Sequence, residues 1–308
     1  RQLYYTINDV ISRFDNQDNE QLLDFMQKRI SKFEYEDSGQ NFIDPVEHAP
    51  DILNQFLELQ QDPDKNKGIP YTYENNRGVV YGFPSLDKAF NGALGGDLVM
   101  IAAKTGEGKT GFAVQLARQF SFFHKYKGYY MNSEMRDDEL VSRLVAPIAR
   151  VKANEIFYGR VEGTKDEITA KNSRISDALN QYMQSAITLS NIPDLTLNKV
   201  VGLSKQLKNT KGLDYLIIDY IGRMTMNYSM NLWDELYEIT KALKKLAKEL
   251  DIPIFVLAQR NHEGEIEGAK KMKNETDGTL MFEPITSSDH EHIQNHIAYS
   301  DQDKVNYR

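Results

Sequence analysis

Short apolar runs alternate with helix-length segments along the chain from about residue 78 onward. Four of these runs have the length and composition of buried strands, and they lie at residues 98–103, 128–133, 214–219 and 253–258. Alternating strands and helices are typical of a mainly parallel sheet whose faces are covered by helices. The pattern therefore predicts an α/β domain.

The clearest helical pattern covers residues 233–250. Its apolar positions follow one another at steps of three and four residues and so share one face: Leu236, Ile239, Leu243, Leu246 and Leu250. Its other face carries Lys241, Lys244, Lys245 and Lys248. A second predicted helix, after the first of the four strands, has an apolar face made of Ala113, Leu116, Phe120 and Phe123.

The first 62 residues are polar and have a helical pattern, with a short amphipathic stretch at 49–61. The sequence QDPDKNKGIP at residues 61–70 lacks apolar periodicity and is typical of a linker. We expect a helical accessory segment at 1–62, a linker at 63–77 and a main domain at 78–308. A chain of 308 residues has room for about two domains.

Composition and charge exclude several classes of protein. The net charge is −8, so a nucleic acid would have to be held by a local basic patch and not by the field of the whole molecule. The absence of cysteine excludes disulfides, thiolate metal sites and a cysteine nucleophile, and it predicts a reducing, cytoplasmic setting. No apolar run approaches the roughly 18 residues of a membrane span, so we expect no membrane partner.

The segment LVMIAAKTGEGKTGFAVQLARQF places a glycine-containing loop between an apolar strand and a helix. This is the setting of a P-loop, in which backbone amides and a helix N-terminus surround phosphates. The predicted nucleotide-binding residues are Thr105, Gly106, Glu107, Gly108, Lys109, Thr110 and Gly111. Lys109 would place its charge on the β and γ phosphates, and Thr110 would offer its hydroxyl to magnesium. Ala103 replaces the first glycine of the usual pattern, and a glycine-rich turn before an ordinary helix is the alternative.

An acidic residue at the tip of a second core strand is the other requirement of such a site, because it orients the magnesium ion through water. Asp219 ends the apolar run LDYLIID, where an unpaired carboxylate would be costly to bury away from a cation. The alternative for Asp219 is a helix N-cap. Asp214 begins the same run and so lies at the wrong end for ligands of an open α/β sheet.

Hydrolysis also needs a base that positions or deprotonates water, and Glu134 follows the second strand closely enough to serve. Asp137, Asp138 and Glu139 are instead expected to open a helix, where carboxylates complement the N-terminal dipole. Gln259 follows the fourth apolar run, where its amide could sense the γ-phosphate. The alternative for Gln259 is an ordinary surface residue at a strand end.

Taken together, these segments resemble the RecA-like motor domain of the DnaB family of replicative DNA helicases. The resemblance covers about residues 78–262 and includes GFPSLDKAFNGALGGDLVMIAAKTGEGKT, YMNSEMRDDELVSRLVA, LDYLIIDYI and ELYEITKALKKLAKELDIPIFVLAQRN. It implies a RecA-like P-loop NTPase core with a mainly parallel twisted sheet. It also implies an enzyme that hydrolyses ATP or another NTP with Mg²⁺, in which Lys109 and Glu134 are catalytic, Gln259 is the sensor, and Thr110 and Asp219 serve the metal.

The resemblance further implies a homo-oligomer, usually a hexameric ring, that moves 5′ to 3′ along single-stranded DNA. Residues 49–61 would be the linker helix, and a primase, a helicase loader or a polymerase would be a partner. The family's DNA-contacting loops map to residues 223–233, which begin with Arg223, and to the segment after Gln259, which holds Lys270, Lys271 and Lys273. Contact of these lysines with phosphates would not depend on sequence. The alternative is that these lysines lie in a solvated loop, since four glutamates flank them.

The arginine finger that the resemblance implies is not identified by a motif in this chain. Arg308, with Lys304 as the nearby lysine, is one candidate for the finger, and Arg260 is a weaker one. A third alternative is that this chain lacks the element that carries the finger. The histidines of SDHEHIQNH are expected to form an exposed polar turn and not a metal site, because a fourth ligand is lacking.

Two other functions fit the same nucleotide pocket. A RecA- or RadA-like recombinase would pair DNA strands from a filament, and a non-motor RecA-like ATPase would regulate partners while it hydrolyses slowly. The matches at Asp219-Tyr220 and at residues 246–250 favour the helicase, of either cellular or phage type. A phage-type member would act in the cytoplasm of its host.

Overall fold

The computed structural model describes residues 45–62, 65, 67–75, 77–224, 232–260, 272 and 274–286. The chain divides into two units, Arg1–Asn66 and Lys67–Arg308. In the first unit the described helix is α3 (Pro45–Gln61), which covers the amphipathic stretch predicted at 49–61. Its apolar side chains Ile52 and Phe56 are half exposed. Its service as a linker helix stays a prediction.

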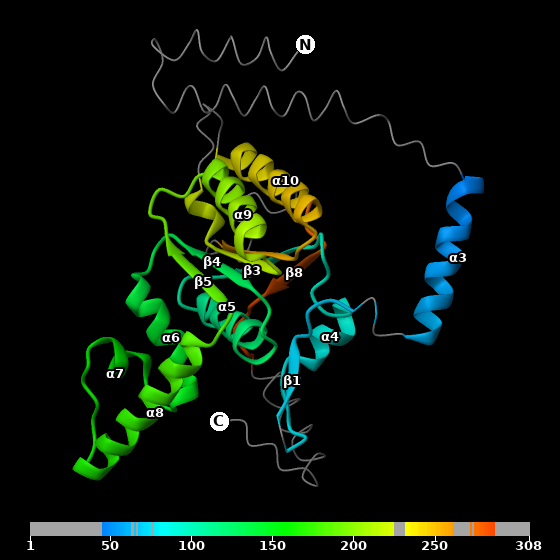
Figure 1. Ribbon diagram of the computed structural model, residues 1–308. Helices are drawn as coiled ribbons and strands as arrows, with labels where there is room; N and C mark the ends of the chain where they lie inside the picture. Colours follow the sequence, from blue (N-terminus) through cyan, green and yellow to red (C-terminus); the bar gives the residue numbers. More distant parts are fainter. Residues whose placement is uncertain are drawn as a thin grey trace. The chain divides into compact units, whose positions relative to one another are not determined.

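The second unit contains a six-stranded parallel sheet in its described residues (Figure 1). Its strands are β3 (Leu98–Ala103), β4 (Gly128–Asn132), β5 (Ile187–Asn191), β6 (Tyr215–Asp219), β7 (Ile254–Gln259) and β8 (Gly278–Met281). They lie in the order β5-β4-β6-β7-β3-β8. The four strands predicted from apolar runs are therefore confirmed, and β5 and β8 form the two edges of the sheet.

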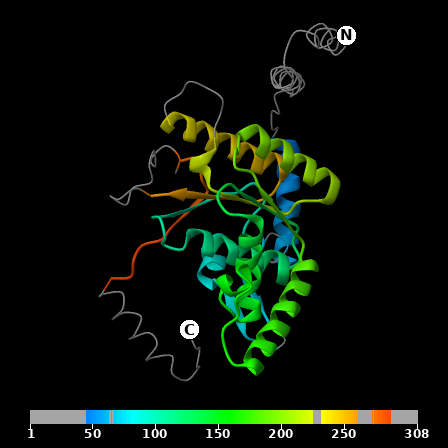
Figure 2. The ribbon, with the colours of Figure 1, turned by 90° about the vertical axis from the view of Figure 1, so that its left-hand side faces the viewer.

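Helices cover both faces of this sheet, with α9 and α10 on one face and α5 on the other (Figures 1 and 2). The helices of the second unit are α4 (Pro84–Phe90), α5 (Lys109–Arg118), α6 (Asp137–Ala149), α7 (Ala153–Phe157), α8 (Lys165–Met183), α9 (Leu197–Lys211) and α10 (Leu232–Leu250). Helix α10 confirms the helix predicted at 233–250. None of the helices among the described residues is long and apolar enough to cross a membrane.

The core lies in two layers because successive side chains of a strand point to opposite faces. In β6, Leu216 and Ile218 pack with α9 and α10, whereas Tyr215 and Ile217 pack with α5. The same alternation places Asp219 on the face of α5. The sheet thus directs the acidic residue toward the helix that follows the glycine-rich loop.

The apolar face predicted after the loop is correct for three of its four residues. Ala113, Leu116 and Phe120 are fully buried, but Phe123 is 37% exposed and stacks on Tyr73 with ring centroids 3.9 Å apart. The cause is a π-helical turn, η1 (Gln119–Phe123), that follows α5. A wider turn of this kind shifts the phase of the side chains, and the last position leaves the predicted face.

The structure differs from the predicted linker at 63–77. Strand β1 (Thr72–Glu74) lies within that range and pairs in antiparallel fashion with β2 (Val80–Gly82). Tyr71 is fully buried, and its backbone N–H donates to Asp87 Oδ1 at 2.7 Å. The sequence does not reveal this earlier start of the domain. The residues that lead up to position 70 are mostly polar, and strands of three residues are too short to give a periodic pattern.

Candidate functional site

The glycine-rich loop, residues 104–108, joins the end of β3 to the first residue of α5. Gly106 and Gly108 have φ angles of 82° and 90°, a left-handed conformation that favours glycine. A Cβ added to Gly106, Gly108 or Gly111 would meet no heavy atom within 4 Å outside the adjoining backbone. The Lys104 N–H donates to Glu107 Oε2 at 2.9 Å. The Glu107 side chain therefore holds the two ends of the turn together, and the glycines face open space.

Asp219 lies at the carboxyl end of β6 and is only 2% exposed. Its Oδ2 atom accepts a hydrogen bond of 2.9 Å from the Tyr130 hydroxyl. Its Oδ1 atom is buried and has no hydrogen-bond partner among the described residues. A buried carboxylate oxygen without a donor is costly, so this atom marks a place where a ligand would add the missing interaction.

Strands β4 and β6 end side by side, with Asn132 opposite Asp219. Ser133 donates to the Asp219 carbonyl from its backbone N–H at 2.9 Å and from its hydroxyl at 3.1 Å. Asn132 Oδ1 accepts the N–H groups of Glu134 and Met135, both at 3.0 Å. The backbone of Glu134 is thus fixed beside the acidic tip, while its side chain is exposed.

Lys109, Asp219 and Glu134 form one electrostatic group. Burial lowers the pKa of Lys109, and the charges of Asp219 and Glu134 raise it. Burial raises the pKa of Asp219; the Tyr130 and Thr110 hydroxyls and the Lys109 charge lower it, and Glu134 raises it. The Lys109 ammonium also lies 4.5 Å from the centroid of the Tyr220 ring. One cation is therefore shared by two carboxylates and an aromatic face.

Gln259 ends β7 and lies opposite Ala103 of β3 in the register of the sheet. Its Nε2 atom donates to Thr105 Oγ1 at 2.7 Å. The amide is thus hydrogen-bonded to the glycine-rich loop, and its role as a sensor stays a prediction.

Several predicted residues take structural positions, as expected. Asp214 Oδ2 accepts the Lys127 N–H at 2.7 Å at the opposite end of the sheet. Asp137, Asp138 and Glu139 lie in the first turn of α6. Asp219 caps no helix, because the short 3₁₀ helix η2 (Ile221–Arg223) has Tyr220 at its N-cap.

The remaining predicted residues are not brought to this group by the structure. Arg260 donates to the Phe282 carbonyl at 2.8 Å and to Glu283 at 3.2 Å, which directs it toward the segment after β8. Arg223 ends η2, and its side chain is outside the described part. Other predicted positions lie outside the described residues: Lys270, Lys271, Lys273, Lys304, Arg308 and the three histidines at 290, 292 and 296.

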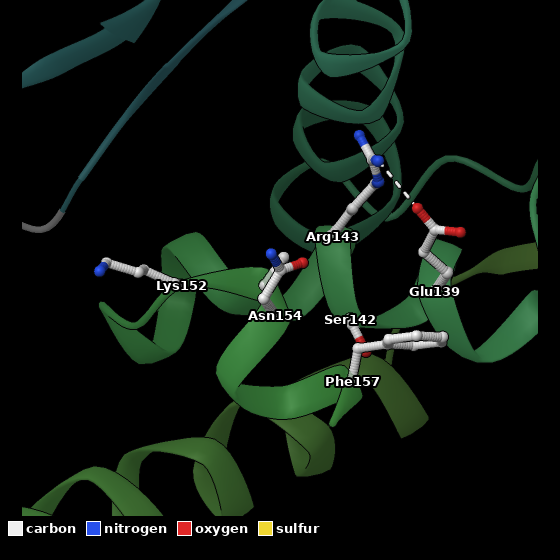
Figure 3. Close-up of a pocket in the computed structure, with 7 residues that line it drawn as sticks. Glu139, Ser142, Arg143, Lys152, Asn154 and Phe157 are labelled. Carbon is white, nitrogen blue, oxygen red and sulfur yellow. Dashed lines mark hydrogen bonds and ion pairs between the residues drawn. The ribbon is translucent and has the colours of Figure 1, made fainter. Parts of the chain in front are cut away.

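A separate cavity of about 360 Å³ lies between α6 and α7 (Figure 3). Its lining includes Arg143, Lys152 and Phe157, and Arg143 forms an ion pair of 2.8 Å with Glu139. Figure 3 shows Lys152 extending away from that pair. No residue of the glycine-rich loop lines it.

The residues at the strand ends fit a magnesium–nucleotide complex. Space is open at Gly106 and Gly108 of the loop and at Gly111 in the first turn of α5, and Lys109 borders the loop. Thr110 and the partnerless Asp219 oxygen supply hard oxygen donors of the type that magnesium prefers. Sequence reasoning missed Tyr130 and Tyr220 as members of the group, although Tyr220 follows Asp219 directly and Tyr130 precedes Asn132 by two residues.

Comparison with known proteins gives relatives of one kind. A replicative DNA helicase DnaB of Leifsonia xyli is 32% identical over 186 residues, which are 60% of this chain and 39% of that protein. A DnaB of Nostoc is 28% identical over 216 residues, 70% of this chain and 23% of that protein. A DnaB of Buchnera aphidicola from Schizaphis graminum is 27% identical over 263 residues, 83% of this chain and 53% of that protein. The chain thus spans about half, or less, of these relatives.

Two solved structures share the fold. An ATPase domain of known structure superposes with a TM-score of 0.67 at 20% identity and covers 77% of this chain and 83% of its own. A DnaB-like replicative helicase, whose structure describes its interactions with primase, has a TM-score of 0.66 at 18% identity and covers 94% and 67%. The family model of the DnaB-like helicase C-terminal domain matches residues 78–274. This match takes in the glycine-rich loop, both acidic strand ends and Gln259, and the chain belongs to the DnaB-like helicase C-terminal domain family.

Proposed function

We propose that this chain is the motor part of an ATP-dependent replicative DNA helicase. It couples hydrolysis of a magnesium-bound nucleotide to movement along single-stranded DNA and to separation of the duplex. The single observation that carries the proposal is the buried, partnerless oxygen of Asp219 in the same electrostatic group as Lys109, at the start of the helix behind an open glycine loop. Membership of the helicase family supports it.

Each residue of the group has one task in this proposal. The amides of the glycine-rich loop and the N-terminus of α5 hold the phosphates, and Lys109 leaves the Tyr220 ring to neutralise them. Thr110 places a hydroxyl, and Asp219 an oxygen, toward the metal position. When bound, magnesium offsets the charge that develops on the transferred phosphoryl group.

Glu134 and Gln259 act on the reacting end of the nucleotide. The Glu134 carboxylate is exposed while its backbone is fixed by Asn132, so it can hold a water molecule and accept its proton. Gln259 is bonded to Thr105, and loss of the γ-phosphate would be felt at this amide and passed to the segment that follows β7.

Assembly and DNA contact complete the proposal. We infer a homo-oligomeric ring, hexameric in the usual case, that moves 5′ to 3′ with DNA held by loops at residues 223–233 and around Lys270, Lys271 and Lys273. Arg308 is the proposed arginine finger. A primase is the first partner to test, because the DnaB-like helicase of similar fold is described with one.

A forked-duplex unwinding assay, with native mass measured in parallel, tests the proposal on the full chain. We expect ATP- and magnesium-dependent unwinding by an oligomer. Lys109→Ala should abolish both unwinding and DNA-stimulated hydrolysis, because it removes the cation that holds the phosphates. Lys245→Ala, on the exposed side of α10, is the matched control and should keep full activity.

The competing functions give different results in the same assay. Strand invasion without fork unwinding would select the recombinase. Slow hydrolysis that DNA does not stimulate would select the regulatory ATPase. Normal turnover by the Lys109→Ala variant would reject the site itself.

A further inference from the structure

We propose that Tyr130 is a positioning residue of this site, which fixes the Asp219 carboxylate so that only Oδ1 is offered to the metal. This inference rests on the proposed function and deepens it. Tyr130 itself touches neither nucleotide nor metal in the proposal. It lies in the core and bonds to Asp219 Oδ2, the oxygen that is not offered to the metal.

The position of Tyr130 follows from the register of two adjacent strands. Tyr130 lies opposite Ile217, and Asn132 lies opposite Asp219, so Tyr130 and Asp219 are diagonal neighbours on one face of the sheet. Aromatic side chains are long enough to reach a diagonal neighbour. The Tyr130 hydroxyl therefore reaches Asp219 Oδ2, at 2.9 Å.

The phenol is held rigidly. Tyr130 is fully buried in the layer that packs with α5, so its ring has no open space in which to turn. Its hydroxyl is the donor of the hydrogen bond to Asp219 Oδ2. A rigid donor fixes the acceptor that it meets.

Strand β4 and the residue that follows it hold Asp219 at two points. Ser133 donates to the Asp219 backbone carbonyl, and Tyr130 donates to its Oδ2. These bonds hold the Asp219 carbonyl and one of its two carboxylate oxygens. The remaining oxygen, Oδ1, has no partner among the described residues and is the atom left for the metal or its water. Outer partners of this kind orient the groups that hold a metal.

Tyr130→Phe tests the inference, because it removes one hydroxyl and keeps the ring. The readout is the affinity of a fluorescent ADP analogue for the full chain, measured with Mg²⁺ and with EDTA. We expect the gain in affinity that Mg²⁺ confers, and the apparent Mg²⁺ affinity, to fall about tenfold, the low end of the loss seen when outer partners are removed. The affinity in EDTA should not change.

Tyr129→Phe is the matched control. Its hydroxyl forms a bond of 2.9 Å with Ser190 Oγ, and the ring packs on the opposite face of the same strand. The control loses an equivalent hydrogen bond away from the site, so its Mg²⁺ dependence should equal that of the wild type. If Tyr130→Phe and Tyr129→Phe lose thermal stability alike and both keep the wild-type Mg²⁺ dependence, Tyr130 is only a structural residue and the inference fails.

A double-mutant cycle with Asp219→Asn supplies a second measurement. If Tyr130 acts through Asp219, then Tyr130→Phe should have no further effect on Mg²⁺ dependence in the Asp219→Asn background. Equal effects in both backgrounds would overturn the inference. Each affinity is referred to the same protein in EDTA, so partial unfolding of a variant does not imitate the result. A wild-type chain without any Mg²⁺-dependent nucleotide binding would instead overturn the proposed function.

Discussion

The two ends of the central sheet treat their carboxylates differently. At the amino end, Asp277 Oδ2 accepts the Leu98 N–H at 2.7 Å and the Lys244 ammonium at 2.5 Å, and Asp214 accepts the Lys127 N–H. At the carboxyl end, Asp219 is more deeply buried and yet keeps an oxygen without a partner among the described residues. Asp219, whose burial costs more, therefore has the less complete hydrogen bonding.

This difference separates structural from functional acids. A carboxylate whose acceptors are filled by backbone N–H groups and a lysine stabilises the fold where it stands. A buried carboxylate with an empty acceptor lowers stability, and such a group is a candidate binding residue.

Glu134→Gln should give the largest effect. Glutamine keeps the size of the side chain but cannot accept a proton, so the rate of hydrolysis should fall about 10²- to 10⁴-fold. Nucleotide binding should persist, because Lys109 and the loop are untouched. Steady-state hydrolysis and equilibrium binding of a fluorescent nucleotide measure the two quantities.

Glu139→Gln is the control for this variant. Glu139 lies five residues later in α6 and pairs with Arg143, beside the cavity of Figure 3. We expect it to hydrolyse nucleotide at the wild-type rate. An unchanged rate for Glu134→Gln would remove Glu134 from the role of base.

Asp277→Ala tests the opposite end of the sheet. The substitution leaves the buried Leu98 N–H and the Lys244 ammonium without this acceptor, so the free energy of unfolding should fall by about 1–3 kcal/mol. Urea unfolding measures this loss. Magnesium-dependent nucleotide affinity of the folded variant should stay at the wild-type value, and a specific loss of affinity would show that the two ends are not separate in function.

Glu155 extends the contrast to a third, fully bonded carboxylate and predicts a small effect with a defined pH range. It accepts from Lys152 N, Glu162 N and Lys171 Nζ at 2.9, 3.2 and 2.8 Å, and these bonds, the Lys171 bond first, lower its pKa to about 2. Because the folded pKa lies below the unfolded one, the stabilisation is complete above about pH 4.5 and is lost as the pH falls toward 2.

Glu155→Gln should therefore be less stable than the wild type at pH 6, and the difference should shrink between about pH 4.5 and 2. Denaturant unfolding at several pH values checks this. A difference that stays constant through that range would mean that the charge of Glu155 does not stabilise the fold.

The central strands and the glycine-rich loop could be predicted from the sequence because their signals are local. A buried strand is a short apolar run, and the loop is a fixed pattern of neighbours. The strands β5 and β8 were not among the four predicted, because edge strands are only half buried and carry mixed residues such as ITLSN. Strand β1 was assigned to a linker for a similar reason.

The interactions that complete the site could not be read from the sequence. The Tyr130–Asp219 bond joins residues 89 positions apart, and the Gln259–Thr105 bond joins residues 154 apart. Such pairs depend on strand order and register, which no local pattern encodes. The π-helical turn at Gln119–Phe123 also has no periodic signal of its own, and it displaced Phe123 from its predicted face.

The order of the strands places Gln259 between the glycine-rich loop and Asp219. Strand β7 separates β3, which leads into the phosphate loop, from β6, which ends in the metal acid. A ligand that contacted both the glycine-rich loop and Asp219 would pass the end of β7, where the Gln259 amide donates to Thr105 of the loop. A displacement of the glycine-rich loop relative to Asp219 would therefore change the hydrogen bond of a single side chain, Gln259.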